Sequence, residues 1–156
     1  MSEEQREVHT ARIRIESMLN LSCPRCGAVF LDFSGSMALT CSAAGCGCGF
    51  CAWCLQDCGN EKDAHHHVAN ECRAKPPGQD RFFGDIEVWK RVHRERVGRE
   101  IQEFLNPKPE ALQEQILAAC RQQLADFGLG DMVPRAENGM DLDELVALQM
   151  QFNGDD

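Results

Sequence analysis

The sequence lacks any long apolar run. No stretch approaches the roughly 18 consecutive apolar residues that a membrane-spanning helix needs, and the first 16 residues are polar and charged, without the apolar centre of a signal peptide. We therefore expect no membrane segment and a cytoplasmic or nuclear location. In these reducing compartments, clustered cysteines more often bind metal ions than form disulfides.

An excess of positive charge is also missing. The formal net charge is −9, which argues against binding of phosphate backbones by the chain as a whole. Residues 81–100 carry six basic and four acidic side chains, whereas residues 126–156 carry eight acidic ones and a single basic one. These runs are typical of a solvated helix face and a solubilising tail. A nucleic-acid-binding zinc module remains an alternative, with steep salt dependence as its signature, through Trp89, Arg91, Arg94, Arg96 and Arg99.

Cysteine, by contrast, is abundant and clustered. Nine of the ten cysteines fall between Cys23 and Cys72, together with three consecutive histidines at 65–67. A segment of about fifty residues buries too little apolar surface to offset its chain entropy, so it needs disulfides or metals to hold its shape. The compartment expected above favours metals.

The spacing of these residues predicts two structural zinc sites. The pattern reads Cys23-x2-Cys26, Cys41-x4-Cys46-x4-Cys51-x2-Cys54 and His67-x4-Cys72. A Cys-x2-Cys pair presents two thiolates from one tight turn, and a closed set of four ligands marks a structural zinc site. A sequential assignment places Cys23, Cys26, Cys41 and Cys46 on one ion, and Cys51, Cys54, His67 and Cys72 on the other. An interleaved arrangement of the same eight ligands stays open.

Three further residues are alternative ligands. Cys48 could replace Cys46, Cys58 could compete with the histidines, and His65 is the next candidate after His67. His67 is preferred because a His-x4-Cys separation can bring both groups to one ion. Cys120 fits the apolar face of a helix as a small buried side chain, and we assign no role to His93.

Hydrophobic periodicity predicts the rest of the fold. We expect helices over 3–19, 85–105 and 109–127, a short helix over 142–152, and strands at 28–33 and 38–40. In the helix over 85–105 the apolar residues share one face, and four arginines point outward: Arg91, Arg94, Arg96 and Arg99. The expected fold class is a small zinc-stabilised α+β protein with a two-zinc loop and hairpin module followed by a helical region. Its expected parts are an N-terminal helix (1–20), the zinc module (21–78), a helical hairpin (79–130) and an acidic tail with a short helix (131–156).

The zinc pattern also resembles a known family. Phe50 directly precedes Cys51, Trp53 lies inside the Cys51-x2-Cys54 pair, and the ligand order continues to the final His and Cys. Over about residues 21–72 the chain is similar to the zinc-binding modules of RING-between-RING ubiquitin ligases, which are the structural in-between-RING domain and the catalytic second RING. The resemblance implies a sequential two-zinc fold, with ubiquitin or a ubiquitin-conjugating enzyme as a partner.

The resemblance also implies where a catalytic cysteine would lie. In the catalytic module a nucleophilic cysteine stands five residues before the third ligand, and this chain has Ser36 there. An unactivated serine hydroxyl is a poor acceptor of ubiquitin compared with a thiolate. We therefore expect an interaction module of the ubiquitin-ligase pathway without catalysis of its own. The alternative is an active ubiquitin transferase that uses Cys48 or Cys58, or one that works as part of a larger ligase.

Overall fold

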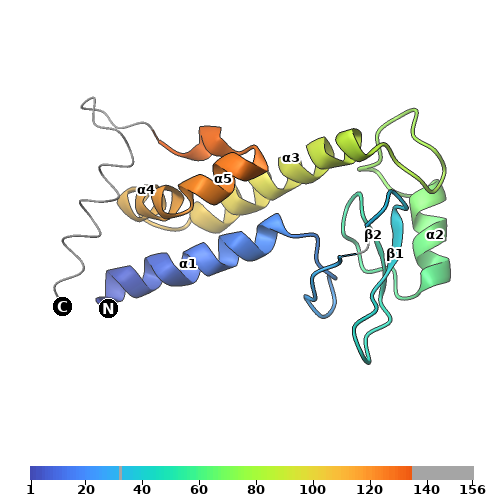
Figure 1. Ribbon diagram of the computed structural model, residues 1–156, viewed down its shortest axis with the longest axis horizontal. Coiled ribbons are helices and arrows are strands. Elements are labelled where there is room, and N and C mark those ends of the chain that lie inside the picture. Colours follow the sequence, from blue (N-terminus) through green and yellow to red (C-terminus); the bar gives the residue numbers. More distant parts are fainter. Residues whose placement is uncertain (32, 135–156) are drawn as a thin grey trace. The chain divides into compact units, whose positions relative to one another are not determined.

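The computed structural model describes residues 1–31 and 33–134 (Figure 1). Within these residues the chain forms five α-helices, one two-stranded antiparallel sheet and a short 3-10 helix, which is an α+β architecture. It divides into two compact units. The cysteine-rich unit is Asn20–Arg96, and the helical unit combines Met1–Leu19 with the residues from Val97 onward.

The division between the units falls inside a helix. Helix α3 spans Ile86–Leu105, so its first half belongs to the cysteine-rich unit, which extends beyond the boundary that we expected near residue 78. The reason is packing, because Trp89 is buried in the same apolar cluster as Phe50 and Trp53. Proline and glycine at 76–78 mark a turn in the chain, but the apolar cluster continues past them.

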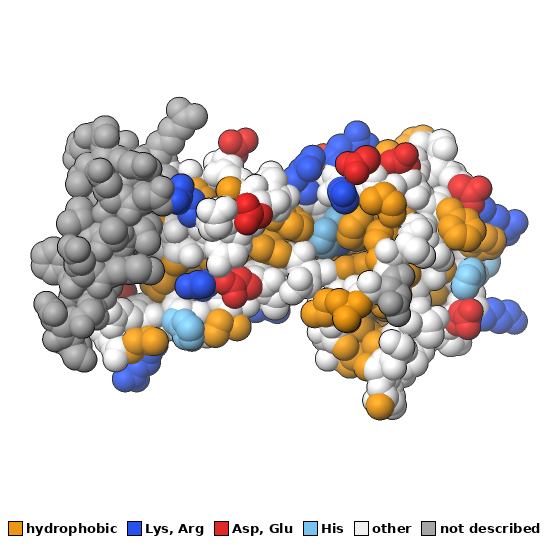
Figure 2. All heavy atoms as spheres, in the orientation of Figure 1, with side chains coloured by type: hydrophobic (Ala, Val, Ile, Leu, Met, Phe, Trp, Pro, Cys, Tyr) orange, Lys and Arg blue, Asp and Glu red, His pale blue; other side chains and the backbone are white. Residues whose placement is uncertain are grey.

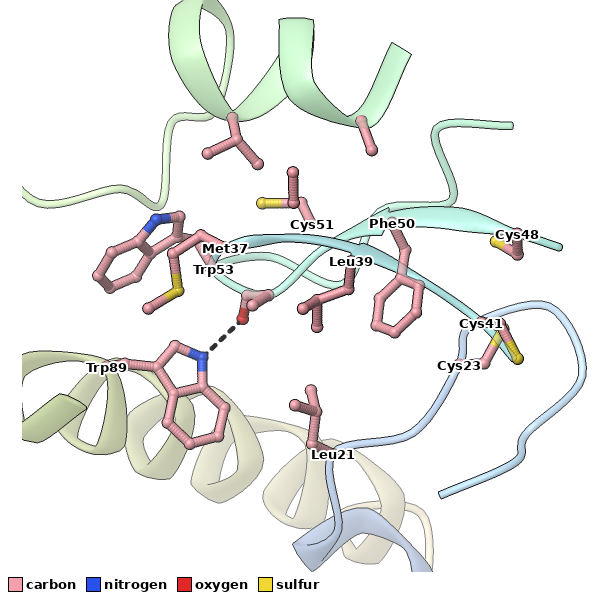
Figure 3. Close-up of a cluster of buried hydrophobic side chains, with 14 residues drawn as sticks. Leu21, Cys23, Met37, Leu39, Cys41, Cys48, Phe50, Cys51, Trp53 and Trp89 are labelled. Atoms are coloured by element: carbon pink, nitrogen blue, oxygen red, sulfur yellow. Dashed lines mark hydrogen bonds between the residues drawn. The ribbon is translucent and has the colours of Figure 1, made fainter. Parts of the chain in front are cut away.

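A small hairpin lies at the centre of the cysteine-rich unit. Strands β1 (Ala38–Thr40) and β2 (Gly49–Cys51) are antiparallel, with Leu39 opposite Phe50. Residues directly opposite each other share a face, and the faces alternate along each strand. Figure 3 shows Leu39 and Phe50 on one side of the hairpin, whereas Cys51 lies on the side of helix α2.

The expected strand at 38–40 is confirmed, and the one at 28–33 is wrong, since none of its described residues (28–31 and 33) belongs to a strand. Val29 makes only an isolated bridge with Ser22, flanked by backbone hydrogen bonds from Cys23 to Ala28 and from Phe30 to Leu21. Helix α1 ends at Leu19, so only a few extended residues precede the Cys23 turn and can pair with this segment.

Helix α2 (Glu61–Asn70) packs against both strands and was not expected from the sequence. The Asn60 side chain caps its first turn by accepting from the backbone N–H of Asp63 at 2.8 Å, which satisfies one of the N–H groups left open at a helix start. Few of its residues are apolar, and Ala64, His67 and Val68 form the buried stripe. That stripe is too narrow for a hydrophobic-periodicity reading to detect.

The helical unit is built from α1 (Glu3–Leu19), the second half of α3, α4 (Glu110–Ala119) and α5 (Arg121–Phe127). Its core contains Ala11, Ile15, Val97, Ile101, Leu105, Ile116, Leu117, Cys120, Leu124 and Val133. The expected helices over 3–19 and 85–105 are confirmed, and Cys120 is fully buried as expected.

The expected single helix over 109–127 is interrupted at Cys120. The N–H of Cys120 bonds to the carbonyls of both Ile116 and Leu117, and its φ and ψ of −99° and 9° leave the helical region. Gly128, with a φ of 95°, then ends α5, and a short 3-10 helix follows at Gly130–Met132. The short helix expected over 142–152 lies outside the described residues. No helix in the described ranges combines the length and the apolar character needed to cross a membrane.

Candidate metal centres

Two groups of four side chains converge within the cysteine-rich unit. The first group is Cys23, Cys26, Cys41 and Cys46, and the second is Cys51, Cys54, His67 and Cys72. In each group the four ligand atoms lie within 4.8 Å of one another, and all ten cysteines are free of disulfides. Each group could therefore hold a zinc ion, and the grouping is the sequential one.

The distances inside each group suit a tetrahedral ion. The Sγ atoms of Cys23 and Cys46 are 3.7 Å apart, those of Cys26 and Cys41 are 3.6 Å apart, and those of Cys51 and Cys72 are 3.7 Å apart. Four thiolates around zinc, each about 2.3 Å from it, would lie about 3.8 Å from one another. The spacing is thus that of a metal shell, and it is far longer than the roughly 2 Å of a disulfide.

The two Cys-x2-Cys turns have the same backbone hydrogen bonds. The Cys23 N–H donates to Ala28 at 2.9 Å, and the Gly27 N–H returns to the Cys23 carbonyl at 2.9 Å. In the second turn Cys51 donates to Gln56 at 3.2 Å, and Leu55 donates to Cys51 at 2.7 Å. Gly27 and Leu55 both have positive φ, 79° and 60°. One local backbone shape thus presents a pair of thiols in each group.

The hairpin separates the two groups. Cys41 directly follows β1, Cys46 lies in the connection to β2, and Cys51 is the last residue of β2, opposite Ala38 at the start of β1. In Figure 3, Cys23 and Cys41 accordingly lie at one end of the strands, and Cys51 lies towards the end occupied by Met37 and Trp53.

Helix α2 supplies the histidine of the second group. His67 is buried, and its Nε2 lies 3.3 Å from the Cys54 Sγ. Its Nδ1 lies 3.9 Å from a carboxylate oxygen of Glu71. Carboxylate partners on the second ring nitrogen are common for metal-bound histidines, whose tautomer they fix. Cys72 follows the end of the helix, where its N–H bonds to the His67 carbonyl at 2.9 Å.

The three alternative ligands lie outside both groups. The His65 Nδ1–H donates to the Glu61 carbonyl at 2.8 Å, and the His65 ring meets the ring of Phe82 edge-on. Cys48 is fully buried. Its burial, and to a smaller extent its hydrogen bond with Asp57, raises the pKa of its thiol to about 12. Cys58 is half-buried, and burial raises its pKa to about 11.

Hydrogen bonds among the thiols of the second group shift the pKa values of Cys51 and Cys72 in opposite directions. Hydrogen bonds with Cys54 and Cys72, together with burial, raise the pKa of Cys51, while the hydrogen bond from Cys51 lowers the pKa of Cys72 to about 2. Crowded thiols cannot all ionise without a counter-charge, because each thiolate disfavours the next. A divalent cation at the centre would supply that charge.

Ser36 lies just before strand β1, where the chain pairs with the segment that precedes helix α3. It forms an isolated bridge with Phe83, and its hydroxyl donates to the Ala38 carbonyl at 3.3 Å. The backbone on either side is paired as well, since Met37 donates to Phe82 and Gly84 donates to Gly35. The Ser36 side chain is thus half-buried in a paired stretch of backbone.

Sequence reasoning missed the side chains of α3 that hold the second Cys-x2-Cys turn. The Trp89 indole N–H donates to the Ala52 carbonyl at 2.9 Å (Figure 3), and Arg96 donates to the Trp53 carbonyl at 2.8 Å. Both carbonyls belong to the residues between Cys51 and Cys54. The expectation that Arg96 points outward is wrong, since only 8% of it is exposed.

His93 also takes part in this arrangement, although the sequence suggested no role for it. Its ring stacks on Trp89 at 4.7 Å with an interplanar angle of 10°, and its Nδ1 contacts Arg96. The only signal in the sequence is the spacing, because residues 89, 93 and 96 fall on one face of a helix.

We predict that losing either of these α3 hydrogen bonds destabilises the second turn. Trp89→Phe and Arg96→Met each leave a buried carbonyl without its donor, which costs about 1–3 kcal/mol. Urea unfolding of the zinc-loaded protein measures the loss. Arg91→Met, an exposed change on the same helix, should stay within about 0.5 kcal/mol; equal effects of all three changes would contradict the assignment.

Comparisons with known proteins gave no relatives: no protein-family model, curated protein or solved structure matches this chain. The fold and the two groups define a small α+β chain with two sets of ligands compatible with zinc-binding modules.

Proposed function

We propose that the chain is a two-zinc interaction module of the ubiquitin-ligase pathway, related to the in-between-RING and second-RING modules. The observation that carries the proposal is the pair of closed four-ligand groups at the two ends of one hairpin. Four protein ligands fill a tetrahedral shell and leave no position for a substrate or a reactive water, so both ions would be structural. The first group would use four thiolates and the second three thiolates with a neutral imidazole.

The absence of the expected nucleophile supports a binding role over transfer of ubiquitin. Ser36 carries a hydroxyl in a paired backbone segment, and the buried Cys48 thiol donates to the Gly49 carbonyl. Cys58, with a pKa raised by burial to about 11, would hold little thiolate at neutral pH.

Exposed apolar side chains on the cysteine-rich unit offer a docking surface. Leu31 is 86% exposed and Val29 49% exposed, and both follow the first Cys-x2-Cys turn. Phe83, which pairs with Ser36, is 58% exposed. Figure 2 shows hydrophobic side chains at the surface of this unit. Large apolar side chains left exposed on so small a unit favour a protein partner, and the family resemblance directs the choice to ubiquitin or a ubiquitin-conjugating enzyme.

An NMR titration tests this binding role. Isotope-labelled ubiquitin, and separately a conjugating enzyme, is titrated with the zinc-loaded protein, and we expect shifts for at least one of them. Leu31→Asp should weaken that binding about tenfold or more, because it removes an apolar contact and adds a charge that binding must desolvate. Ile13→Asp is the matched control, since Ile13 is an exposed apolar residue (54%) on the helical unit. Binding of neither protein at millimolar concentration would refute the proposed partners.

The transferase alternative predicts a different result. Supplied with charged conjugating enzyme, an active transferase would form an adduct with ubiquitin that a reducing agent removes, and the adduct would vanish in Cys48→Ser or Cys58→Ser. We expect no such adduct.

The nucleic-acid alternative loses part of its basis. Of the four arginines expected to form a basic face, Arg96 is buried and donates to Trp53, and Trp89 is likewise buried. Two of the residues expected to contact nucleic acid, Trp89 and Arg96, are therefore buried and hydrogen-bonded inside the cysteine-rich unit.

A further inference from the structure

Arg25 joins parts of the chain that belong to different metal groups. It lies between Cys23 and Cys26 in the first turn, and its Nε and Nη2 donate to the two carboxylate oxygens of Asp57 at 3.0 and 2.9 Å. Its Nη2 also donates to the Gly59 carbonyl at 3.0 Å, and its Nη1 contacts the Cys46 carbonyl at 3.5 Å. One guanidinium thus has four contacts within a single small region.

The segment that receives these contacts leads into the second group. Residues 57–59 connect Cys54 to α2, which carries His67. The segment is also attached to β2, because Cys58 donates to the Gly49 carbonyl at 2.8 Å, and the Gly59 N–H closes onto the Asp57 carboxylate at 2.9 Å. Arg25 therefore helps to fix the position of the segment that connects Cys54 to His67.

The contacts are of a kind that requires a fixed donor. A two-point guanidinium–carboxylate pair is geometrically specific, since both N–H groups must align with both oxygens. The Asp57 carboxylate stays ionised, because the hydrogen bond from Arg25 lowers its pKa to about 2. Arg25 can align in this way only while its own turn keeps its shape, and the two thiols that flank it would be held in place by the first zinc ion.

We infer that Arg25 couples the two metal centres, so that zinc in the first group favours zinc in the second and the two ions bind cooperatively. The inference rests on the proposed function, since it requires that both groups bind zinc. Coupling between sites is reciprocal: if the first ion strengthens binding of the second, the second strengthens binding of the first to the same degree. The effect is a property of Arg25 and Asp57, whereas the ligands themselves set the intrinsic affinities.

Native mass spectrometry during stepwise removal of zinc by a chelator tests the coupling. The parent protein should pass from two zinc ions to none with little of the one-zinc species. In Arg25→Met, which keeps most of the side-chain length, we expect more of the one-zinc species. The coupling factor between the two binding steps, obtained from the populations with zero, one and two zinc ions, should fall at least about fivefold, the lower end of typical coupling between sites. Alkylation of the cysteines, mapped by mass, then identifies which group has lost its ion.

Two milder variants and a control complete the design. Arg25→Lys keeps the charge but loses the two-point geometry, and Asp57→Asn removes the carboxylate; both should also accumulate the one-zinc species, so the test survives if Arg25→Met does not fold. Adding Arg25→Met to Asp57→Asn should have less than its separate effect, because the pair acts together. Arg12→Met breaks an exposed ion pair with Glu16 in α1 and should behave like the parent.

The outcomes separate the two proposals. If the parent binds two zinc ions and all the Arg25 and Asp57 variants lose them with the parent's profile, the coupling is refuted and the two-zinc proposal stands. If the parent itself binds fewer than two zinc ions, the proposed function fails first.

Discussion

Replacing one cysteine of either group by serine is expected to unfold the cysteine-rich unit. Structural zinc in small modules contributes about 10–16 kcal/mol of apparent binding free energy near neutral pH, whereas whole domains are stable by only about 5–15 kcal/mol. Cys51→Ser is the sharpest case, because Cys51 is fully buried, ends β2 and faces three other ligands. We expect loss of its zinc ion and of the dispersed NMR signals of residues 20–96.

Cys58→Ser is the matched control for this prediction. Cys58 lies four residues beyond Cys54 but outside both groups, so its serine variant should keep two zinc ions. Acid should have the same effect as removing a ligand, because protons compete with zinc for thiolates and for imidazole, so zinc is released as the pH falls. Two zinc ions retained in Cys51→Ser would contradict the assignment of the second group.

Gly49→Ala is expected to be nearly as damaging, for a steric reason. A Cβ at Gly49 would lie 1.9 Å from the Asn60 carbonyl oxygen, 2.2 Å from its carbon and 2.8 Å from the Glu61 nitrogen. All three are backbone atoms at the start of α2, and no side chain can rotate away to make room. The start of α2 must move by more than an ångström, which we expect to cost about 3 kcal/mol or more.

The consequence for the second metal centre can be measured directly. Because α2 carries His67 and leads to Cys72, its displacement should weaken binding of the second zinc ion more than the first. Zinc stoichiometry and urea unfolding of Gly49→Ala report both effects. Gly45→Ala is the control: Gly45 has a φ of 79° but open space around it, so it should cost only about 1–2 kcal/mol, the usual penalty of the left-handed region. A similar loss in both variants would exclude the close approach of β2 and α2.

The spacing of cysteine and histidine made the candidate site predictable. A tight turn needs two intervening residues to aim two thiols at one ion, and such a requirement is local enough to be written in the sequence. The same is true of the long helices, whose apolar faces at Ile15 or Ile101 recur at the helical period. The residues that the structure brings into the two groups are therefore those that the spacing suggested.

Other features depended on contacts between distant segments. Helix α2 buries only a narrow apolar stripe, and it is stable because that stripe packs against the hairpin. The sequence pattern does not show where the hairpin lies relative to this helix. Strand β2 consists of three residues, and only its pairing with β1 distinguishes it from a loop. The segment after Gly27 is the opposite case. Val29 and Leu31 have the residue types of a strand, but the neighbouring backbone offers only an isolated bridge between Val29 and Ser22.

Taken alone, the order of the residues determined the ligand types, their spacing and the helical faces, because each of these depends on neighbours a few positions apart. Only the tertiary structure decided that Arg96 turns inward to the Trp53 carbonyl, that Trp89 belongs to the cysteine-rich core, and that Arg25 reaches Asp57. The physical reason is that each partner comes from a distant part of the sequence. For Arg96 there is a further reason, since a charged side chain becomes buried only where folding has placed an acceptor for it.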